Sequence, residues 1–178
     1  MVVYNNPIVL QRADPWVLKV DGEYYFTASD PEYNCIAIRH ASSINDLQKA
    51  PETVVWGKHE CGPASIYIGA PELQRINGAW YIYFAGAATD FEASGLPTHR
   101  MFVLENTDDD PTSDNWVEKG QIVTTIDSFA LDATTEVIDG VQYLVWAQKD
   151  PAIEGNSNLY IAKMANPWTL GSEPVMLT

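Results

Sequence analysis

Residues 14–26 read DPWVLKVDGEYYF, an apolar run followed by a two-residue turn and an aromatic-rich run. The same order returns at residues 70–82 (APELQRINGAWYI) and at residues 132–144 (DATTEVIDGVQYL). The turns Asp21-Gly22, Asn77-Gly78 and Asp139-Gly140 lie at the same place in each copy, so the copies align without a gap. Such dipeptides between alternating runs are a strong hairpin signal, because Gly accepts the positive φ that a type I′ turn needs. Each copy therefore predicts a tight β-hairpin.

The spacing of the copies predicts the architecture. Successive turn glycines are 56 and 62 residues apart, which is about the length of a four-stranded propeller blade. A third strand and a Trp-marked fourth segment are expected after each hairpin, at Trp56, Trp116 and Trp168. The best helical pattern is a turn or two over residues 43–50. We predict an all-β, propeller-type chain with one domain and three blades, at about residues 1–62, 63–124 and 125–178.

Composition excludes several classes of partner. The formal net charge is −14, so nucleic acid and anionic membrane surfaces would be repelled and a neutral ligand fits better. The chain lacks an apolar run of the roughly 20 residues that cross a bilayer. Residues 1–6 lack the basic and apolar regions of a signal peptide. We therefore expect a cytoplasmic protein, or a secreted one if a leader was trimmed away.

Metal-site patterns are weak in this chain. Cys35 and Cys61 stand outside any Cys-x-x-Cys spacing and are expected to be free thiols. The three histidines form no zinc motif and are expected to be ordinary loop or strand-end residues: His40, His59 and His99. The acidic run at residues 108–114 lacks the Gly and closing Glu of an EF-hand, which favours a solvated loop.

Two acidic residues occupy one address in different copies. Asp14 and Asp132 both begin the repeated pattern, whereas the middle copy has Ala70 there. The first strand of every propeller blade lies along the central channel, so we expect both side chains to point into one cavity. A lone Asp at a strand start is more often a turn or cap residue. Two at equivalent positions favour a functional site.

The residues around these positions resemble glycoside hydrolase family 43. The resemblance rests on ADPW at residues 13–16, GAPEL at 69–73, the run at 77–84, THRMFVLEN at 98–106 and SFALDA at 128–133. It covers nearly the whole chain, and THRMFVLEN is similar to branches with α-L-arabinofuranosidase and related activities. The resemblance implies a five-bladed β-propeller that hydrolyses glycosidic bonds with inversion, using three acidic residues. It implies no organic cofactor, and it allows a metal ion in the axial channel whose ligands these residues do not identify.

By the same resemblance, Asp14 matches the general base and Asp132 matches the Asp that orients and tunes the general acid. The acid itself is a Glu expected in the next blade, and no matching segment occurs before Thr178. Glu136 is a poor substitute, because it lies near the turn at the far end of its strand. Three blades of five point to the N-terminal part of a longer enzyme. We expect the isolated chain to be inactive, and to self-associate or pair with a complementary C-terminal portion.

Aromatic residues near the strand starts are candidates for binding sugar, because pyranose and furanose rings present apolar C–H faces. Trp16 follows Asp14 by two residues and is expected on the same strand face. Tyr67 and Phe129 precede the second and third strand starts. The long connection at residues 87–98 is long enough to shape a pocket.

We predict a glycosidase acting on arabinose- or xylose-containing plant saccharides, most consistent with an exo-acting α-L-arabinofuranosidase. The alternative is a carbohydrate-binding or protein-interaction propeller without catalysis, in which the two Asp residues only bind ligand or solvent. The missing acid is what separates the two interpretations.

Overall fold

Three antiparallel sheets follow one another along the chain in the computed structural model, which describes residues 4, 6–88 and 98–177. The first sheet contains β1 (Ala13–Val20), β2 (Glu23–Ser29), β3 (Cys35–Ala41) and β4 (Glu52–Gly57). The second contains β5 (Ile66–Ile76), β6 (Ala79–Ala87), β7 (Arg100–Asn106) and β8 (Val117–Gln121). The third contains β9 (Ala130–Ile138), β10 (Val141–Gln148), β11 (Asn158–Asn166), β12 (Thr169–Leu170) and β13 (Val175–Met176). The prediction of an all-β chain is confirmed.

Helix is confined, within the described residues, to one short 3₁₀ segment, η1 (Ile44–Gln48). It begins after Ser43, whose hydroxyl accepts a hydrogen bond from the Asp46 backbone N–H. The buried Leu47 anchors it beneath the first sheet. This is the single helical stretch that the sequence pattern predicted.

The hairpin turns have the backbone that their sequences demand. Asp21, Asn77 and Asp139 have φ near 50°, and the following glycines have φ of 89°, 85° and 77°. Positive φ at both central positions defines the type I′ turn, which matches the right-handed twist of the flanking strands. These turns join β1 to β2, β5 to β6 and β9 to β10, the first two strands of each sheet.

The third sheet differs from the prediction in its fourth position. A four-stranded blade with a Trp-marked fourth segment is predicted, whereas β12 and β13 are two short strands that both pair with β11. Between them the chain turns away at Gly171, where an added Cβ would lie 2.8 Å from the backbone nitrogen of Ala165. Pro174 then has no N–H to offer a neighbouring strand. Gly171 and Pro174 therefore interrupt the outer strand of the third sheet.

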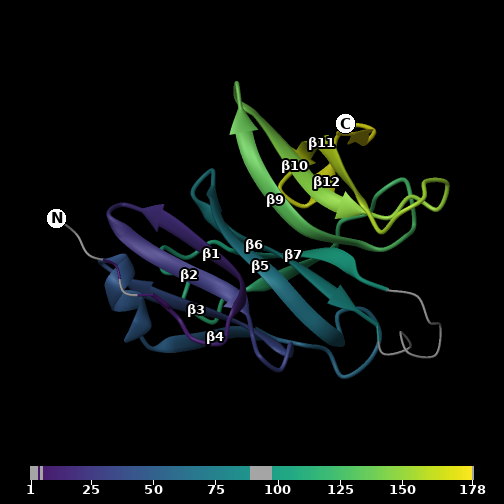
Figure 1. Cartoon of the computed structure of the whole chain (residues 1–178). Coiled ribbons are helices and arrows are strands. Elements are labelled where there is room, and N and C mark those ends of the chain that lie inside the picture. The colour runs from purple at the N-terminus through teal and green to yellow at the C-terminus, as the bar shows by residue number, and fades with distance from the viewer. Residues whose placement is uncertain (1–3, 5, 89–97, 178) are drawn as a thin grey trace.

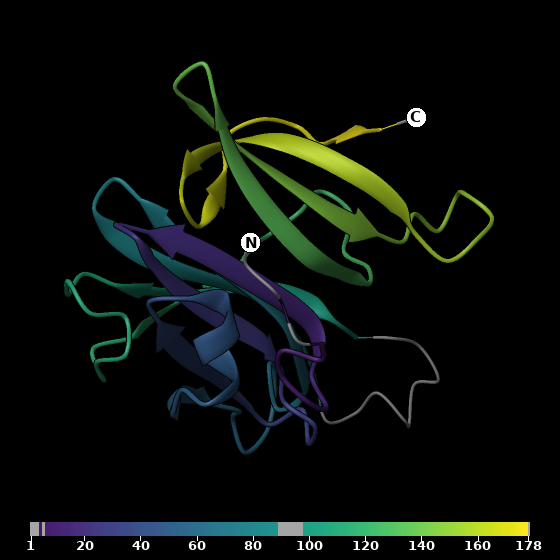
Figure 2. The same ribbon diagram turned by 60° about the vertical axis from the view of Figure 1, so that its left-hand side comes forward.

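The sheets stack through their first strands into an arc. β1 and β2 pack against β5, and β5, β6 and β7 pack against β9. Figure 1 and Figure 2 show β1, β5 and β9 on the inner side of this arc, with the later strands of each sheet farther out. Equivalent positions on the inner strands therefore face one common region.

Two apolar clusters hold neighbouring sheets together. The junction of the first and second sheets buries Ile36, Leu73, Trp80 and other side chains, with Trp16 packed against them. The junction of the second and third sheets buries Tyr83, Leu144 and Trp146. Burial of each such side chain is worth roughly 1.5–3 kcal/mol, so the junctions fix the relative positions of the inner strands.

Candidate active site

The repeated address has the same backbone distortion in all three sheets. Asp14, Ala70 and Asp132 have φ of 50°, 48° and 56°, in the left-handed region. At each one the strand register shifts, so that two residues of the inner strand lie opposite a single residue of the next strand. That single residue is Ala28 in the first sheet, Phe84 in the second and Trp146 in the third. This is a β-bulge, a feature that re-aims a side chain next to functional sites.

The bulge explains how a side chain leaves the regular alternation of its strand. A left-handed conformation costs a non-glycine residue roughly 1–2 kcal/mol, and Asp tolerates it better than most residues. Ala70 adopts it too, with no carboxylate to compensate. The distortion is therefore a feature of all three sheets, and in two of them the distorted residue is an Asp.

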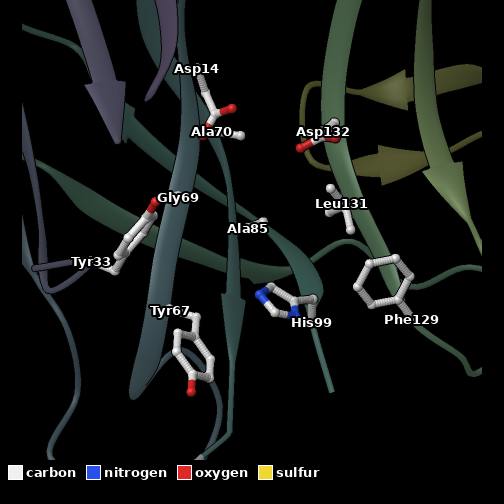
Figure 3. Close-up of a pocket in the computed structure, with 10 residues that line it drawn as sticks. All are labelled: Asp14, Tyr33, Tyr67, Gly69, Ala70, Ala85, His99, Phe129, Leu131 and Asp132. Atoms are coloured by element: carbon white, nitrogen blue, oxygen red, sulfur yellow. The ribbon is translucent and has the colours of Figure 1, made fainter. Parts of the chain in front are cut away.

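Asp14 and Asp132 line one pocket, as the repeat pattern predicted. Its volume is about 330 Å³, and its other walls come from all three sheets and from the connection after β2. The lining residues are Asp14, Tyr33, Tyr67, Gly69, Ala70, Ala85, His99, Phe129, Leu131 and Asp132. Figure 3 shows the two carboxylates on opposite sides of the space, with Ala70 beside Asp14. A ligand entering this pocket would lie between two acids.

The acids have different surroundings. Burial raises the pKa of Asp132, and the nearby Asp14 charge adds to the rise, because two like charges resist joint ionisation. The Asp14 carboxylate accepts a hydrogen bond of 2.6 Å from the Ser29 hydroxyl. Burial and the neighbouring charge thus shift Asp132 toward its protonated form.

Glu72 is a third carboxyl group near the pair, and no role for it is predicted from the sequence. It lines a smaller hollow together with Asp14 and Asp132. Burial raises its pKa, against hydrogen bonds from the side chains of Thr134 and Gln74. Its Oε2 atom is buried without a hydrogen-bond partner. Only its place in GAPEL could have drawn attention to it, because a polar residue inside a strand pattern is ordinary.

The other end of the pocket is aromatic. His99 stacks on Tyr67, with ring centroids 5.9 Å apart, and meets Phe129 edge-on at 5.5 Å. Burial lowers the pKa of His99, and its Nδ1 atom is buried without a hydrogen-bond partner. Figure 3 shows the three rings together below the carboxylates. The structure therefore brings Tyr67 and Phe129 to the pocket as expected, and adds His99, for which the sequence predicts only an ordinary loop or strand-end residue.

Trp16 is placed differently from the aromatic pair. It lines the smaller hollow beside Asp14, and its ring packs into the apolar junction of the first two sheets. Its indole N–H donates to the Leu73 carbonyl at 2.8 Å. The ring is thus fixed between blades, and its contact with a sugar stays a prediction.

Comparison with known proteins identifies the family. The model of glycosyl hydrolases family 43 matches residues 4–178. The chain belongs to this family.

Relatives of this family 43 chain were found among curated proteins and solved structures. It is 47% identical over 178 residues to an extracellular exo-α-(1→5)-L-arabinofuranosidase of Streptomyces avermitilis, covering 99% of the chain and 36% of that protein. It is 45% identical over 176 residues to a protein of the same name from Streptomyces chartreusis, covering 98% of the chain and 52% of that protein. The crystal structure of an α-L-arabinofuranosidase from Lactobacillus brevis superposes with a TM-score of 0.94 at 52% identity, covering 98% of this chain and 56% of that one. The chain therefore spans between about a third and somewhat over half of the length of these relatives. The superposition on the Lactobacillus brevis enzyme, together with the three antiparallel sheets, shows the β-propeller architecture.

The expectation of a cytoplasmic location is wrong. Two of these family 43 relatives are named as extracellular enzymes. The expectation rested on residues 1–6, which lack a signal-peptide pattern. These residues do not decide where the natural protein is located. Among the described residues, no helix has the length and apolarity needed to cross a membrane.

Glu136 and the acidic run of this family 43 chain lie away from the pocket. Glu136 is exposed and pairs with Tyr143 near the β9–β10 turn. The acidic run after β7 is a hydrogen-bonded loop, in which Thr112 donates to Asp110 and Ser113 to Asp108. Of the connection expected to shape the pocket, residues 89–97 lie outside the described part of the chain. Within the described part, no group of three or more His, Cys, Asp or Glu side chains could hold a metal ion.

Proposed function

We propose that the full-length natural protein is an inverting glycosidase that removes terminal α-L-arabinofuranosyl units from arabinose-containing plant saccharides. The observation that carries the proposal is the pair of carboxylates, Asp14 and Asp132, presented by equivalent bulges across one pocket. Membership of family 43 and the names of the relatives support the reaction class and the arabinose preference.

In this proposal Asp14 is the general base. An inverting enzyme needs an ionised carboxylate that takes a proton from the attacking water, on the face of the sugar opposite the leaving group. Asp14 is exposed to the pocket, where its carboxylate accepts a hydrogen bond from the Ser29 hydroxyl. A water held between Asp14 and the anomeric carbon would attack as the glycosidic bond breaks.

Asp132 has the second role, which is to orient and tune the general acid. A carboxylate beside another acid disfavours ionisation of that acid and so keeps its proton available for the leaving oxygen. We place the acid outside residues 1–178, in line with the family pattern. The reaction as proposed uses no organic cofactor, and no step in it is assigned to a metal.

The aromatic end of the pocket would hold the sugar. Tyr67 and Phe129 offer apolar faces for its C–H groups, and Trp16 would contact it from the smaller hollow. A volume of about 330 Å³ lies near the lower end for ligand pockets, which suits one terminal sugar ring better than a long chain. The preference for arabinofuranosides over xylosides is part of the proposal.

Partners and location follow from the same proposal. The names of the relatives support secretion of the full-length protein. The exposed apolar side chains of the third sheet, Leu159 and Val175 among them, support packing against a complementary C-terminal portion or a second copy.

The test is hydrolysis of nitrophenyl α-L-arabinofuranoside and nitrophenyl β-D-xylopyranoside by the full-length protein. We expect turnover of the arabinofuranoside, and a loss of about 10²- to 10⁴-fold in kcat for Asp14→Ala. Glu136→Ala is the matched control, because it removes an exposed carboxylate from the far end of β9 and should leave kcat unchanged. An Asp14→Ala variant that folds and keeps full activity would rule out this role.

A further inference from the structure

The Asp14 carboxylate is connected to the second sheet through one buried hydroxyl. Ser29, the last residue of β2, donates from Oγ to Asp14 Oδ2 at 2.6 Å. The same Oγ accepts a hydrogen bond from the Ala70 backbone N–H at 2.8 Å. Ser29 is only 2% exposed. The bulges of the first and second sheets are thus joined by a hydroxyl that water cannot easily replace.

The direction of both hydrogen bonds is fixed. A backbone N–H can only donate, so Ser29 Oγ must accept from Ala70 and has its single hydrogen left for Asp14. Asp14 Oδ2 is therefore an acceptor in this arrangement. Within the described part of the chain, Ser29 is the hydrogen-bond partner of the Asp14 side chain; Asp14 lines the pocket, and its Oδ1 atom takes no part in that bond.

The surroundings leave room for this hydroxyl and for little else. A Cβ added at Gly69 would lie 3.1 Å from Ser29 Oγ, so a side chain there would push against it. Two residues earlier on β2, the buried Thr27 hydroxyl donates to the Pro71 carbonyl at 2.6 Å. β2 thus forms side-chain hydrogen bonds to the backbone of the second bulge from Thr27 and from Ser29. Of these two hydroxyls, Ser29 is the one that also bonds a carboxylate.

We propose that Ser29 is a positioning residue that holds Asp14 in the orientation for base catalysis, so that Oδ1 is the oxygen that takes the proton from the attacking water. The inference rests on the proposed function. The left-handed backbone at residue 14 aims the carboxylate, and the hydrogen bond from Ser29 fixes its rotation. Since a displacement of about 1 Å in a reacting group can cost about 10²-fold in rate, a freely rotating carboxylate would be a poor base.

The test is a double-mutant cycle on hydrolysis of nitrophenyl α-L-arabinofuranoside by the full-length protein. Ser29→Ala should lower kcat by about 10- to 100-fold with little change in KM, because substrate contacts are kept. In the Asp14→Ala background, Ser29→Ala should cause no further loss, since there is no carboxylate left to orient. Thr27→Val is the matched control: it removes a buried hydroxyl bond at the same junction, and should lower the denaturation midpoint with only a small effect on kcat.

Each outcome decides between explanations. If Ser29→Ala lowers kcat no more than Thr27→Val does, or if its loss adds to that of Asp14→Ala, Ser29 only supports the fold and the inference is wrong. Wild-type turnover with an unimpaired Ser29→Ala variant overturns the role of Ser29 alone. Absence of wild-type turnover overturns the proposed function, and the inference with it.

Discussion

At the scale of single residues, the two acids of the pocket acquire different properties from their neighbours. Both residues are exposed at the pocket. Asp14 accepts a hydrogen bond from the Ser29 hydroxyl, whereas partial desolvation and the Asp14 charge raise the pKa of Asp132. In the proposed mechanism Asp14 takes a proton from the attacking water, and Asp132 tunes a general acid that lies outside residues 1–178. The division of roles is thus consistent with local physical chemistry.

His99 provides a prediction about recognition. Because burial lowers its pKa, the imidazole is neutral near pH 7, and we expect it to form a hydrogen bond with a sugar hydroxyl in the pocket that it lines. His99→Phe keeps a ring between Tyr67 and Phe129 but removes both nitrogens. We expect KM for the arabinofuranoside to rise about 3- to 10-fold, the equivalent of one neutral hydrogen bond, with kcat nearly unchanged. Steady-state kinetics that show the wild-type KM would place His99 in a purely packing role.

Glu72 provides a prediction that separates it from the general acid. The rise in its pKa favours the protonated form, which Gln resembles in shape and hydrogen bonding. We expect Glu72→Gln to leave kcat nearly unchanged, in contrast to Asp14→Ala. A drop of about 10²- to 10⁴-fold in kcat for Glu72→Gln would instead identify it as a proton donor within this chain.

At the scale of strands and loops, the sequence predicted what depends on local chemistry. The three hairpins followed from Asp-Gly and Asn-Gly, and the convergence of Asp14 and Asp132 followed from their shared address. The bulge could not be predicted, because the pairing of two residues with one depends on the partner strand. Ala70 adopts the same bulge as the two Asp residues, so no residue type marks it in the sequence. His99 was missed for a related reason: it has no repeat counterpart, and its place between two rings arises only from the packing of the second and third sheets.

The connection between the first and second sheets should be sensitive to pH. The hydrogen bond to Glu118 raises the pKa of His59, and Trp56 donates to the same carboxylate at 2.6 Å. A pKa above the unfolded value means that this contact stabilises the fold fully at pH below about 6.5 and is lost as the pH rises through the folded-state pKa. Both side chains of the pair are more than a third exposed, so its worth stays under about 1 kcal/mol.

His59→Gln isolates that charge, because Gln can still donate a neutral hydrogen bond to Glu118. The free energy of unfolding of the wild type should exceed that of the variant at pH about 5.5 and match it more closely at pH about 8.5. Chemical denaturation at the two pH values measures this difference. A difference that is the same at both values would mean that protonation of His59 plays no part.

At the scale of the whole molecule, the three sheets form an open arc with its apolar surface unevenly covered. The second sheet is packed on both sides, whereas the third exposes a set of apolar side chains. These are Val137, Ile138, Val141, Leu159, Val175, Met176 and Leu177. A surface of this kind on a soluble protein marks an interaction site or an aggregation hazard.

The 178-residue chain by itself should therefore associate in solution. We expect sedimentation velocity to show species larger than a monomer in proportion to concentration, and Leu159→Lys with Val175→Lys to reduce them. The same preparation should not hydrolyse nitrophenyl α-L-arabinofuranoside, because the general acid lies elsewhere in the proposal. A stable, inactive monomer would contradict the predicted association, and turnover by this chain would show that one of its own residues donates the proton.

In the proposed mechanism Asp14 and Asp132 face one sugar from opposite sides. The most direct measurement is a crystal structure of the full-length Asp14→Asn variant with an α-1,5-linked arabino-oligosaccharide, which the variant should bind without turning over. The account predicts a terminal arabinose in the pocket, with its anomeric carbon between residue 14 and Asp132 and its ring against Tyr67 and Phe129. A sugar bound at another surface, or an anomeric carbon out of reach of residue 14, would contradict it.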